Sequence, residues 1–524
     1  MANRISTTLL QVGVVAVVLA ALPYKLFELD RYFVPKELVL HVVALIVVVT
    51  FILRRRTISV DLADVLLALF LAWSAASALF ATNHWLAQRA LGVSVSGALI
   101  FWAARRVGAA GAYRPILIAA AIATVVAAAT ALAQAYGVES DYFSTNRAPG
   151  GTFGNRNFVA HIVAIGLPTV VWCTATARRP IGALLGSLSG ALLAAALVLS
   201  RSRAAWLAMA ACVVVLFFPM LVSRKYWEHQ KVGGRLARFL LAAVIGGLLA
   251  VVIPNRLNWS SESPYLDSAR GMVEYKKGSG RGRLAQYQNS LRMAAANPVL
   301  GVGPGNWPVR YVRFAPSGDR SIADDGMTAN PWPSSDWVAL VSERGFVAAF
   351  ALLGTFAALF FGAFRGWREL ADSDAILVRL ALAGTIVATM VVSAFDVALL
   401  LAAPAFLVWS ILGAASGGRR RGRQLSLSSR AWALAAVGTV LIVVASTARS
   451  VTQTMAMSAV GQGGHTAAWV RAAKLDPGSY RINLRVAELY ARRGKCGVAG
   501  AYARRAVGLF PYAPAARRIA RKCA

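Results

Sequence analysis

Apolar residues along this chain are gathered into runs that are separated by shorter polar segments. A helix needs about 20 mainly apolar residues to cross the hydrocarbon core of a bilayer, and thirteen runs approach that length. The pattern therefore predicts an all-α fold, a polytopic bundle of about thirteen transmembrane helices. We place them at residues 9–26, 38–53, 62–81, 90–104, 115–136, 158–176, 181–199, 204–222, 236–253, 345–364, 376–393, 397–413 and 431–448.

The first run follows Arg4 and is short enough to be confused with a signal peptide. Its end, Tyr24-Lys25-Leu26-Phe27, is not a small-residue cleavage site, and many further apolar runs follow. We expect a first transmembrane helix.

Two polar segments interrupt the pattern. Residues 254–344 form a large loop rich in Trp, Tyr, Pro and Gly, and residues 451–524 form a polar tail. Loops of this length are usually functional. The predicted organisation is helices 1–9 in residues 1–253, the loop in 254–344, helices 10–13 in 345–450, and a small helical tail.

Charge orients the bundle. The chain is 58% hydrophobic, above the usual share of soluble proteins, yet its net charge is +33. Basic residues gather in alternate connections, which predicts that those connections and the N-terminus are cytoplasmic. An odd number of spans then places the tail in the periplasm of a bacterial inner membrane. No nucleic-acid recognition motif is present. The basic set includes Arg54 to Arg56, Arg105, Arg106, Arg114, Arg178, Arg179, Arg224, Lys225, Lys231, Arg235, Arg238, Arg365, Arg368, Arg379, Arg419 to Arg421, Arg423 and Arg430.

Glycine and asparagine precede the sixth span in Gly-Gly-Thr-Phe-Gly-Asn-Arg-Asn, residues 150–157. Glycines allow tight turns, and the N–H groups of a helix N-terminus favour an anion. A loop with Asn157 as the helix cap explains the same residues more simply. Asn155, Asn157 and the nearby Arg147 are candidate substrate ligands.

The eighth span begins on the outer side with Ser-Arg-Ser-Arg, residues 200–203. Arg201 and Arg203 can extend to the lipid headgroups. Alternatively they bind phosphate through their planar guanidinium groups, and we favour the deeper Arg203.

The large loop contains a predicted amphipathic helix from Arg283 to Ala296, with Leu284, Tyr287, Leu291 and Ala295 on one face. Pro298 and three spaced glycines should end it. The glycine run follows a helix rather than a strand, so it is not a dinucleotide-binding fingerprint.

Two acids enter the tenth span. Asp336 and Glu343 share a face if a helix begins at Asp336. A solvated helix start, where the dipole favours acids, explains both residues. A general base explains at least one of them more specifically.

Together these segments resemble the superfamily of O-antigen ligases and Wzy-type O-antigen polymerases, over roughly residues 10–415. The resemblance rests on GTFGNRN, SRSRAAWL, RLAQYQNSLRMAAANPVLGVGPGNW and SSDWVALVSERG, in that order. It implies a GT-C-like fold, and a glycan donor carried on undecaprenyl diphosphate. It also implies an outer-leaflet acceptor such as lipid A core, and neither cofactor nor metal. Carried over by position, Arg203 and Arg283 hold the diphosphate.

One departure concerns the base. The family's histidine falls at Ser334 and the asparagine after it at Ser335. A serine takes up no proton near neutral pH. Asp336 then supplies the base, or the mechanism or acceptor differs, or activity is weak or absent. His161 is a further candidate on the outer side, although a hydrogen-bonded helix histidine is the commoner case.

A metal site is the weaker alternative at the same loop. Its acids are oxygen ligands of the kind that divalent cations take, but exposed loop acids are usually only solvated. The set is Asp319, Asp324, Asp325 and Asp336.

The tail shows one 34-residue spacing typical of a tetratricopeptide repeat, from Pro477 to Pro511. It can pack on the large loop or bind a protein partner. Its many arginines suit anionic headgroups, phosphorylated glycolipid or acidic polysaccharide, or they are a solvated helix face. Cys496 and Cys523 would face an oxidising periplasm, so we expect a disulfide between them.

The leading hypothesis is therefore transfer of a lipid-linked glycan. Three enzyme types fit it and differ in the acceptor: a ligase, a polymerase and a protein O-oligosaccharyltransferase. A transporter and a non-catalytic scaffold for polysaccharide assembly are the alternatives. No inverted repeat supports a transporter, and the missing histidine keeps the scaffold open.

Overall fold

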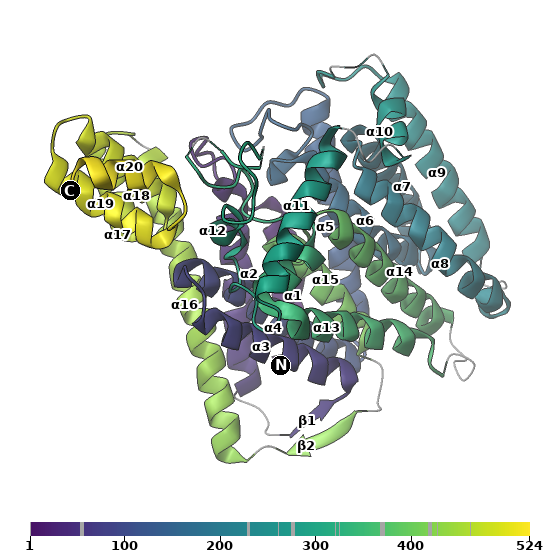
Figure 1. Cartoon of the computed structure of the whole chain (residues 1–524). Helices are drawn as coiled ribbons and strands as arrows, with labels where there is room; N and C mark the ends of the chain where they lie inside the picture. Colours follow the sequence, from purple (N-terminus) through teal and green to yellow (C-terminus); the bar gives the residue numbers. More distant parts are fainter. Residues whose placement is uncertain are drawn as a thin grey trace.

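The structure is a computed structural model, and it is helical apart from two short strands (Figure 1). It describes residues 2–52, 57–227, 231–259, 261, 263–273, 278–319, 321–323, 325–366, 373–417, 422–426, 428–461 and 463–524. The long apolar helices are α1 (Ala2–Leu19), α2 (Asp30–Ile52), α3 (Leu62–Leu79), α4 (His84–Ala109), α5 (Tyr113–Ala135), α6 (Arg156–Ala175), α7 (Pro180–Ser200), α8 (Arg203–Trp227), α9 (Val232–Val252), α13 (Asp336–Phe364), α14 (Ser373–Phe395), α15 (Ala402–Ser416) and α16 (Ser429–Gly461).

Each predicted span coincides with one of these helices. Within the described residues, eleven are long and apolar enough to cross a membrane, and α1 and α15 are shorter. Several helices extend past the predicted bounds: α2 begins at Asp30 rather than at 38, α13 at Asp336 rather than at 345, and α16 ends at Gly461 rather than at 448. At two other bounds the chain is not helical where a span was predicted. The first helix ends at Leu19 rather than at residue 26, and the twelfth begins at Ala402 rather than at 397. In the second case, residues 397–401 form a turn whose N–H groups bind a buried carboxylate, as described below.

The connections alternate between the two ends of the bundle. One end carries β1 (Thr57–Val60), which follows α2, and β2 (Arg423–Ser426), which precedes α16, and the two strands pair antiparallel (Figure 1). The large loop and the tail lie at the other end, which we call the loop side. Of the basic residues that orient the bundle, Arg54 to Arg56, Arg368 and Arg419 to Arg421 lie outside the described residues.

The core lies around α6, α14 and α15, whose side chains are largely buried on all faces. Small residues allow close helix contact there, because a Cβ on Gly413 of α15 would lie 2.3 Å from the carbonyl oxygen of Phe101 in α4. Helices α8, α9 and α16 expose many large apolar side chains. In a membrane these faces would contact lipid.

Three helices make up the large loop, namely α10 (Pro264–Val273), α11 (Gly278–Ala296) and α12 (Trp307–Tyr311). The predicted apolar face of α11 was wrong: Leu284 and Leu291 are 44% and 50% exposed. The buried face is polar because its groups find hydrogen-bond partners. Ser290 accepts the indole N–H of Trp307 at 2.8 Å.

The glycines after α11 lock the loop onto α13. Gly345 interrupts α13 with a φ of 76°, and Phe346 N–H donates to the carbonyl of Pro298 at 3.0 Å. A Cβ on Gly345 would lie 2.0 Å from the carbonyl oxygen of Val299, and one on Gly301 would lie 2.2 Å from the carbonyl carbon of Glu343. These glycines are required for the close approach of two backbones.

The tail is a group of four helices attached to the top of α16, α17 (Thr466–Leu475), α18 (Tyr480–Ala491), α19 (Cys496–Leu509) and α20 (Pro514–Lys522). The expected disulfide joins Cys496 to Cys523. The tail packs on the loop side, where the Trp85 indole donates to Asp476 at 2.7 Å and Arg310 donates to Tyr512 at 3.2 Å. The helix pair α18–α19 lies between Pro477 and Pro511. Its assignment as a tetratricopeptide repeat stays a prediction.

Candidate functional site

Five arginines from four separate segments gather on the loop side of the bundle. Arg156 interacts electrostatically with Arg147 and Arg201, Arg201 with Arg203, and Arg203 with Arg283. We call these five residues the arginine cluster. Like charges repel, so the cluster concentrates a positive potential that an anionic ligand would relieve.

The cluster residues come from the ends of helices, where the chain enters or leaves the predicted membrane region. Arg147 lies between α5 and α6, Arg156 begins α6, and Arg201 and Arg203 lie at the α7–α8 junction. Arg283 lies on α11 in the large loop. Segments that are distant in the sequence therefore bring their guanidinium groups close together at the loop-side end of the bundle.

Backbone strain marks two of these positions. Arg147 and Arg201 have φ values of 59° and 52°, in the left-handed region that non-glycine residues rarely adopt. Such strain costs of order 1–3 kcal/mol per residue and is concentrated at functional sites. At Arg201 the turn lets the side chain reach Ser268 of α10, with Nε donating to Oγ at 2.8 Å.

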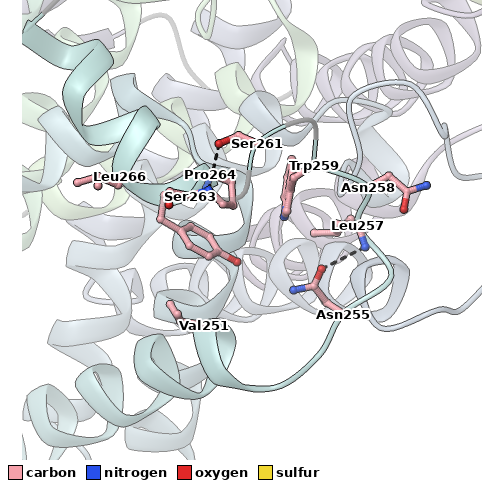
Figure 2. A pocket seen from close by; sticks show the side chains of 10 residues that line it. Val251, Asn255, Leu257, Asn258, Trp259, Ser261, Ser263, Pro264 and Leu266 are labelled. Carbon is pink, nitrogen blue, oxygen red and sulfur yellow. Dashed lines mark hydrogen bonds between the residues drawn. The ribbon is translucent and has the colours of Figure 1, made fainter.

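A tryptophan links the cluster to a cavity. The guanidinium carbons of Arg201 and Arg156 lie 4.6 Å and 5.2 Å from the centre of the Trp259 ring. Cation–π contacts of this kind hold two like charges near one another. Trp259 also lines an open cavity of about 710 Å³, formed by the segment from the end of α9 to the start of α10 (Figure 2).

The lining of that cavity mixes apolar and polar groups. Figure 2 shows Val251, Leu257 and Leu266 beside the polar side chains of Asn255 and Asn258. Mixed lining of this kind suits an amphipathic ligand. Nearby, partial burial and Arg203 lower the pKa of Arg201, whereas Asp267 and Tyr265 act in the opposite direction.

The glycine-rich loop is held by protein groups. The N–H groups of Gly150 and Gly151 both donate to Oε1 of Gln134 at 2.8 Å, which fixes the loop against α5. The cap of α6 is Asn155 rather than Asn157, because Asn155 Oδ1 accepts the N–H of Asn157 at 3.0 Å. The loop thus positions Arg147 and Arg156, whose backbones are joined by a hydrogen bond. The side-chain amide of Asn157 does not cap the helix and is directed toward Asp396.

A carboxylate that the sequence analysis did not single out faces the cluster. Oδ2 of Asp396, in the turn between α14 and α15, lies 3.8 Å from Nη2 of Arg283 and 3.8 Å from Nε2 of His161. The Asn157 amide approaches the same oxygen at 3.5 Å. The Asp396 side chain is 12% exposed. It is therefore partly desolvated but still reachable from the site.

His161 lies behind Asp396 and is fully buried. Neither of its ring nitrogens makes a hydrogen bond with any residue that the structure describes. Such an unsatisfied polar group is uncommon in a folded interior and calls for an explanation. At 3.8 Å, the imidazole of His161 interacts electrostatically with the carboxylate of Asp396.

Polar contacts fix the orientation of α11, and hence of Arg283. Nη1 of Arg283 donates to the carbonyl of Phe395 at 2.8 Å. Tyr287 donates to the carbonyl of Ser334 at 2.5 Å, and burial raises the pKa of this tyrosine to about 12, so it remains a donor. Ser334 donates its N–H to Oε1 of Gln286 at 2.9 Å.

The carboxylates of Asp336 and Glu343 accept hydrogen bonds from backbone N–H groups. Asp336 is fully buried, and its oxygens accept the N–H groups of Ala398, Leu399 and Leu400 at 2.8, 2.9 and 3.3 Å. Glu343 accepts the N–H groups of Gly305 and Trp307 at 2.9 and 3.0 Å. This geometry favours roles in holding the start of α15 and the glycine turn over the role of a base.

The structural role of Asp336 leads to a prediction. Replacing Asp336 with alanine should lower the free energy of unfolding by about 3 kcal/mol, because three buried N–H groups lose their acceptor. Thermal melting in detergent measures the effect. Glu488→Ala is the control, since its pair with Arg485 is exposed and should contribute under about 1 kcal/mol. Unchanged melting together with lost activity would instead support Asp336 as a base.

The acids considered for a metal are occupied separately where the structure describes them. Asp319 accepts the hydroxyl of Tyr311 at 2.8 Å, and Asp325 pairs with Arg481 at 3.1 Å. Asp324 lies outside the described residues. Among the described residues, no group of three or more His, Cys, Asp or Glu side chains could hold a metal ion.

Three site residues were missed by sequence reasoning, namely Arg156, Trp259 and Asp396. The signal for Asp396 was present, since a single acid within the run Ser-Ala-Phe-Asp-Val-Ala at 393–398 is costly near a membrane and is a functional candidate by default. Trp259 had no such signal, because its role depends on which arginines lie beside it.

One comparison with known proteins indicates a family that part of the chain resembles. Residues 188–353 match the family model described as O-antigen ligase. The match runs from α7 into α13, and it includes Arg201, Arg203 and Arg283. It covers less than half of the chain, and no curated protein matches the chain. The match supports a membrane glycan ligase or polymerase type of function in general terms.

Proposed function

We propose that this protein transfers a glycan from undecaprenyl diphosphate to an acceptor at the outer leaflet of a bacterial inner membrane, as an O-antigen ligase does. The observation that carries the proposal is the arginine cluster beside an open, mixed cavity at one end of the helical bundle. A lipid-linked diphosphate combines the two features such a site would recognise, a concentrated negative charge and a long apolar chain.

The arginines would act on the leaving group. The acceptor hydroxyl attacks the anomeric carbon of the first sugar, the bond from that carbon to the diphosphate oxygen breaks, and the diphosphate leaves with the electron pair. Negative charge grows on the diphosphate as the bond breaks. Fixed cations that are already oriented stabilise this charge more than the ground state.

Asp396 is the proposed base. It would accept the proton of the acceptor hydroxyl, the role that the family's histidine fills and that Ser334 does not. Its contact with Arg283 places the base and the leaving-group cations in the same site. His161 would act as a positioning residue, since it touches Asp396 and is buried away from any acceptor.

The orientation of the chain follows from the same proposal. The end of the bundle with β1 and β2 carries the predicted cytoplasmic arginines, so the arginine cluster and the tail lie in the periplasm. The Cys496–Cys523 disulfide supports this side for the tail, because disulfides persist in oxidising compartments.

The function is tested with protein reconstituted in liposomes and a labelled undecaprenyl-diphosphate glycan. Arg203→Ala is expected to weaken donor binding by about tenfold or more, the loss of one charge-assisted contact. Arg313→Ala, an exposed arginine of the same loop, should bind normally. Three acceptors are offered in parallel: lipid A core, a second lipid-linked glycan, and a protein.

Each outcome has a meaning. Product on lipid A core alone identifies a ligase, product on the lipid-linked glycan identifies a polymerase, and glycosylated protein identifies an O-oligosaccharyltransferase. Normal donor binding in the Arg203 variant, or no product with any acceptor, would contradict the proposal.

A further inference from the structure

The tail carries a large excess of positive charge. Residues 463–524 contain thirteen Lys and Arg residues and only two acids, Asp476 and Glu488. The basic residues are Arg471, Lys474, Arg481, Arg485, Arg492, Arg493, Lys495, Arg504, Arg505, Arg517, Arg518, Arg521 and Lys522. All thirteen are exposed.

The two acids do little to offset this charge. Asp476 is buried and accepts from Trp85 and Gln453. Glu488 pairs with Arg485 at 3.3 Å, and Arg481 pairs with Asp325 of the large loop at 3.1 Å. Within the part of the chain that the structure describes, the other eleven basic residues form no ion pair.

The charges lie on the outer faces of adjacent helices. In α20, Ala516 and Ile519 pack into the tail core, whereas Arg517, Arg518, Arg521 and Lys522 face outward. In α19 the alanines 499, 503 and 506 are buried, and Arg504 and Arg505 are exposed. Because α19 packs against both α18 and α20, these exposed basic residues belong to one packed helical unit, and together we call them the tail basic surface.

The tail basic surface remains accessible in the whole protein. The tail contacts the rest of the chain through α17, which packs on α16, and through Asp476, Tyr480, Arg481, Leu509 and Tyr512. Its C-terminus lies at the far end, away from the transmembrane helices (Figure 1). The basic residues near the disulfide therefore face open solution.

A lipid surface is the less suitable partner. Helices that bind in a bilayer interface present Trp, Phe or Leu beside their basic residues. Among the large apolar side chains described in the tail, only Val498 is exposed, and the apolar side of α20 is used within the tail core. The tail basic surface has charge without an apolar anchor, which suits a soluble polyanion.

We propose that the tail basic surface binds a strand of acidic polysaccharide, a sugar polymer with repeating carboxylate or phosphate groups. Among the described residues, eleven of the thirteen basic side chains form no ion pair, so this concentration of positive charge suits an anionic partner. Repeating anions along a strand would contact several arginines at once and release their counterions. The inference does not depend on glycan transfer, because none of the thirteen residues belongs to the arginine cluster.

Binding is measured on the full-length protein in neutral-lipid nanodiscs by fluorescence anisotropy with labelled alginate, a polyuronate, and with neutral dextran of the same length. Two tail variants are used, Arg517→Gln/Arg518→Gln and Arg504→Gln/Arg505→Gln. The matched control is Arg292→Gln/Arg313→Gln, which removes two exposed charges from the large loop. Phosphatidylglycerol vesicles provide the lipid comparison in a flotation assay.

We expect alginate to bind, dextran not to bind, and each tail variant to weaken alginate binding by about tenfold with a shallower salt dependence. The loop control should stay within about twofold. Equal losses in tail and loop variants, equal binding of dextran, or tail-dependent binding of vesicles without binding of alginate would overturn the inference. Arg283→Ala should leave alginate binding intact, which separates this result from failure of the transfer reaction.

Discussion

The Arg283→Ala variant is expected to lose glycan transfer by a factor of about 10²–10³, the usual effect of removing one oriented group that stabilises developing charge. Arg283 is the cluster residue that contacts the proposed base, at 3.8 Å from Asp396, and it interacts electrostatically with Arg203. Its loss removes a cation from the leaving group and also leaves Asp396 without its positive neighbour. Transfer is measured as labelled product formed per minute at saturating donor.

The control for this variant lies on the same helix. Arg292→Ala removes an exposed arginine from α11, nine residues further along, and should keep transfer within about twofold. Arg283→Lys should recover only part of the activity, because an ammonium group lacks the planar fork that binds two phosphate oxygens. Wild-type transfer by a correctly folded Arg283→Ala protein would remove Arg283 from the site.

The Asp396→Asn variant is expected to lower transfer by about 10²–10⁴-fold, the range of contributions from general bases. Asparagine keeps the size of the side chain and its hydrogen bond from the N–H of Val397, but it accepts no proton. Donor binding should remain within a few fold, since the arginine cluster is still present. Donor binding measured beside transfer supplies the second readout, because loss of a base lowers the rate of the chemical step without weakening donor binding.

Two comparisons separate a base from a merely structural acid. Asp396→Glu should recover measurable transfer, because a longer carboxylate still accepts a proton. Asp141→Asn is the matched control, an exposed acid of the α5–α6 loop that pairs with Lys25 at 2.8 Å. If Asp396→Asn retains more than about a tenth of the wild-type rate, another group must accept the proton and Asp396 is not the base.

The helical architecture was predictable because lipid imposes a simple requirement. Every backbone polar group in the hydrocarbon must be satisfied within its own segment, so apolar runs of sufficient length become helices. The main errors in span bounds arose where tertiary contacts replaced that rule. Residues 397–401 are apolar enough to continue α15, yet the N–H groups of Ala398, Leu399 and Leu400 bind Asp336 instead.

Part of the candidate site could also be predicted. Arg147, Arg201, Arg203 and Arg283 were expected to bind substrate, and the structure brings them together with Arg156. The roles of the acids could not be read in the same way. Asp336 follows the serines of a motif and seemed suited to be a base, but whether a carboxylate is buried and satisfied depends on which backbone N–H groups fold against it.

The sequence by itself determined that this chain is a helical membrane protein, where its spans lie, and which cations stand at their ends, because apolar length and charge placement are local properties. The tertiary structure decided that Asp336 and Glu343 hold turns, that the buried face of α11 is polar, and that Asp396 meets Arg283 and His161. Those outcomes depend on distances between α6, α11 and the α14–α15 turn, and no single segment encodes a distance to another.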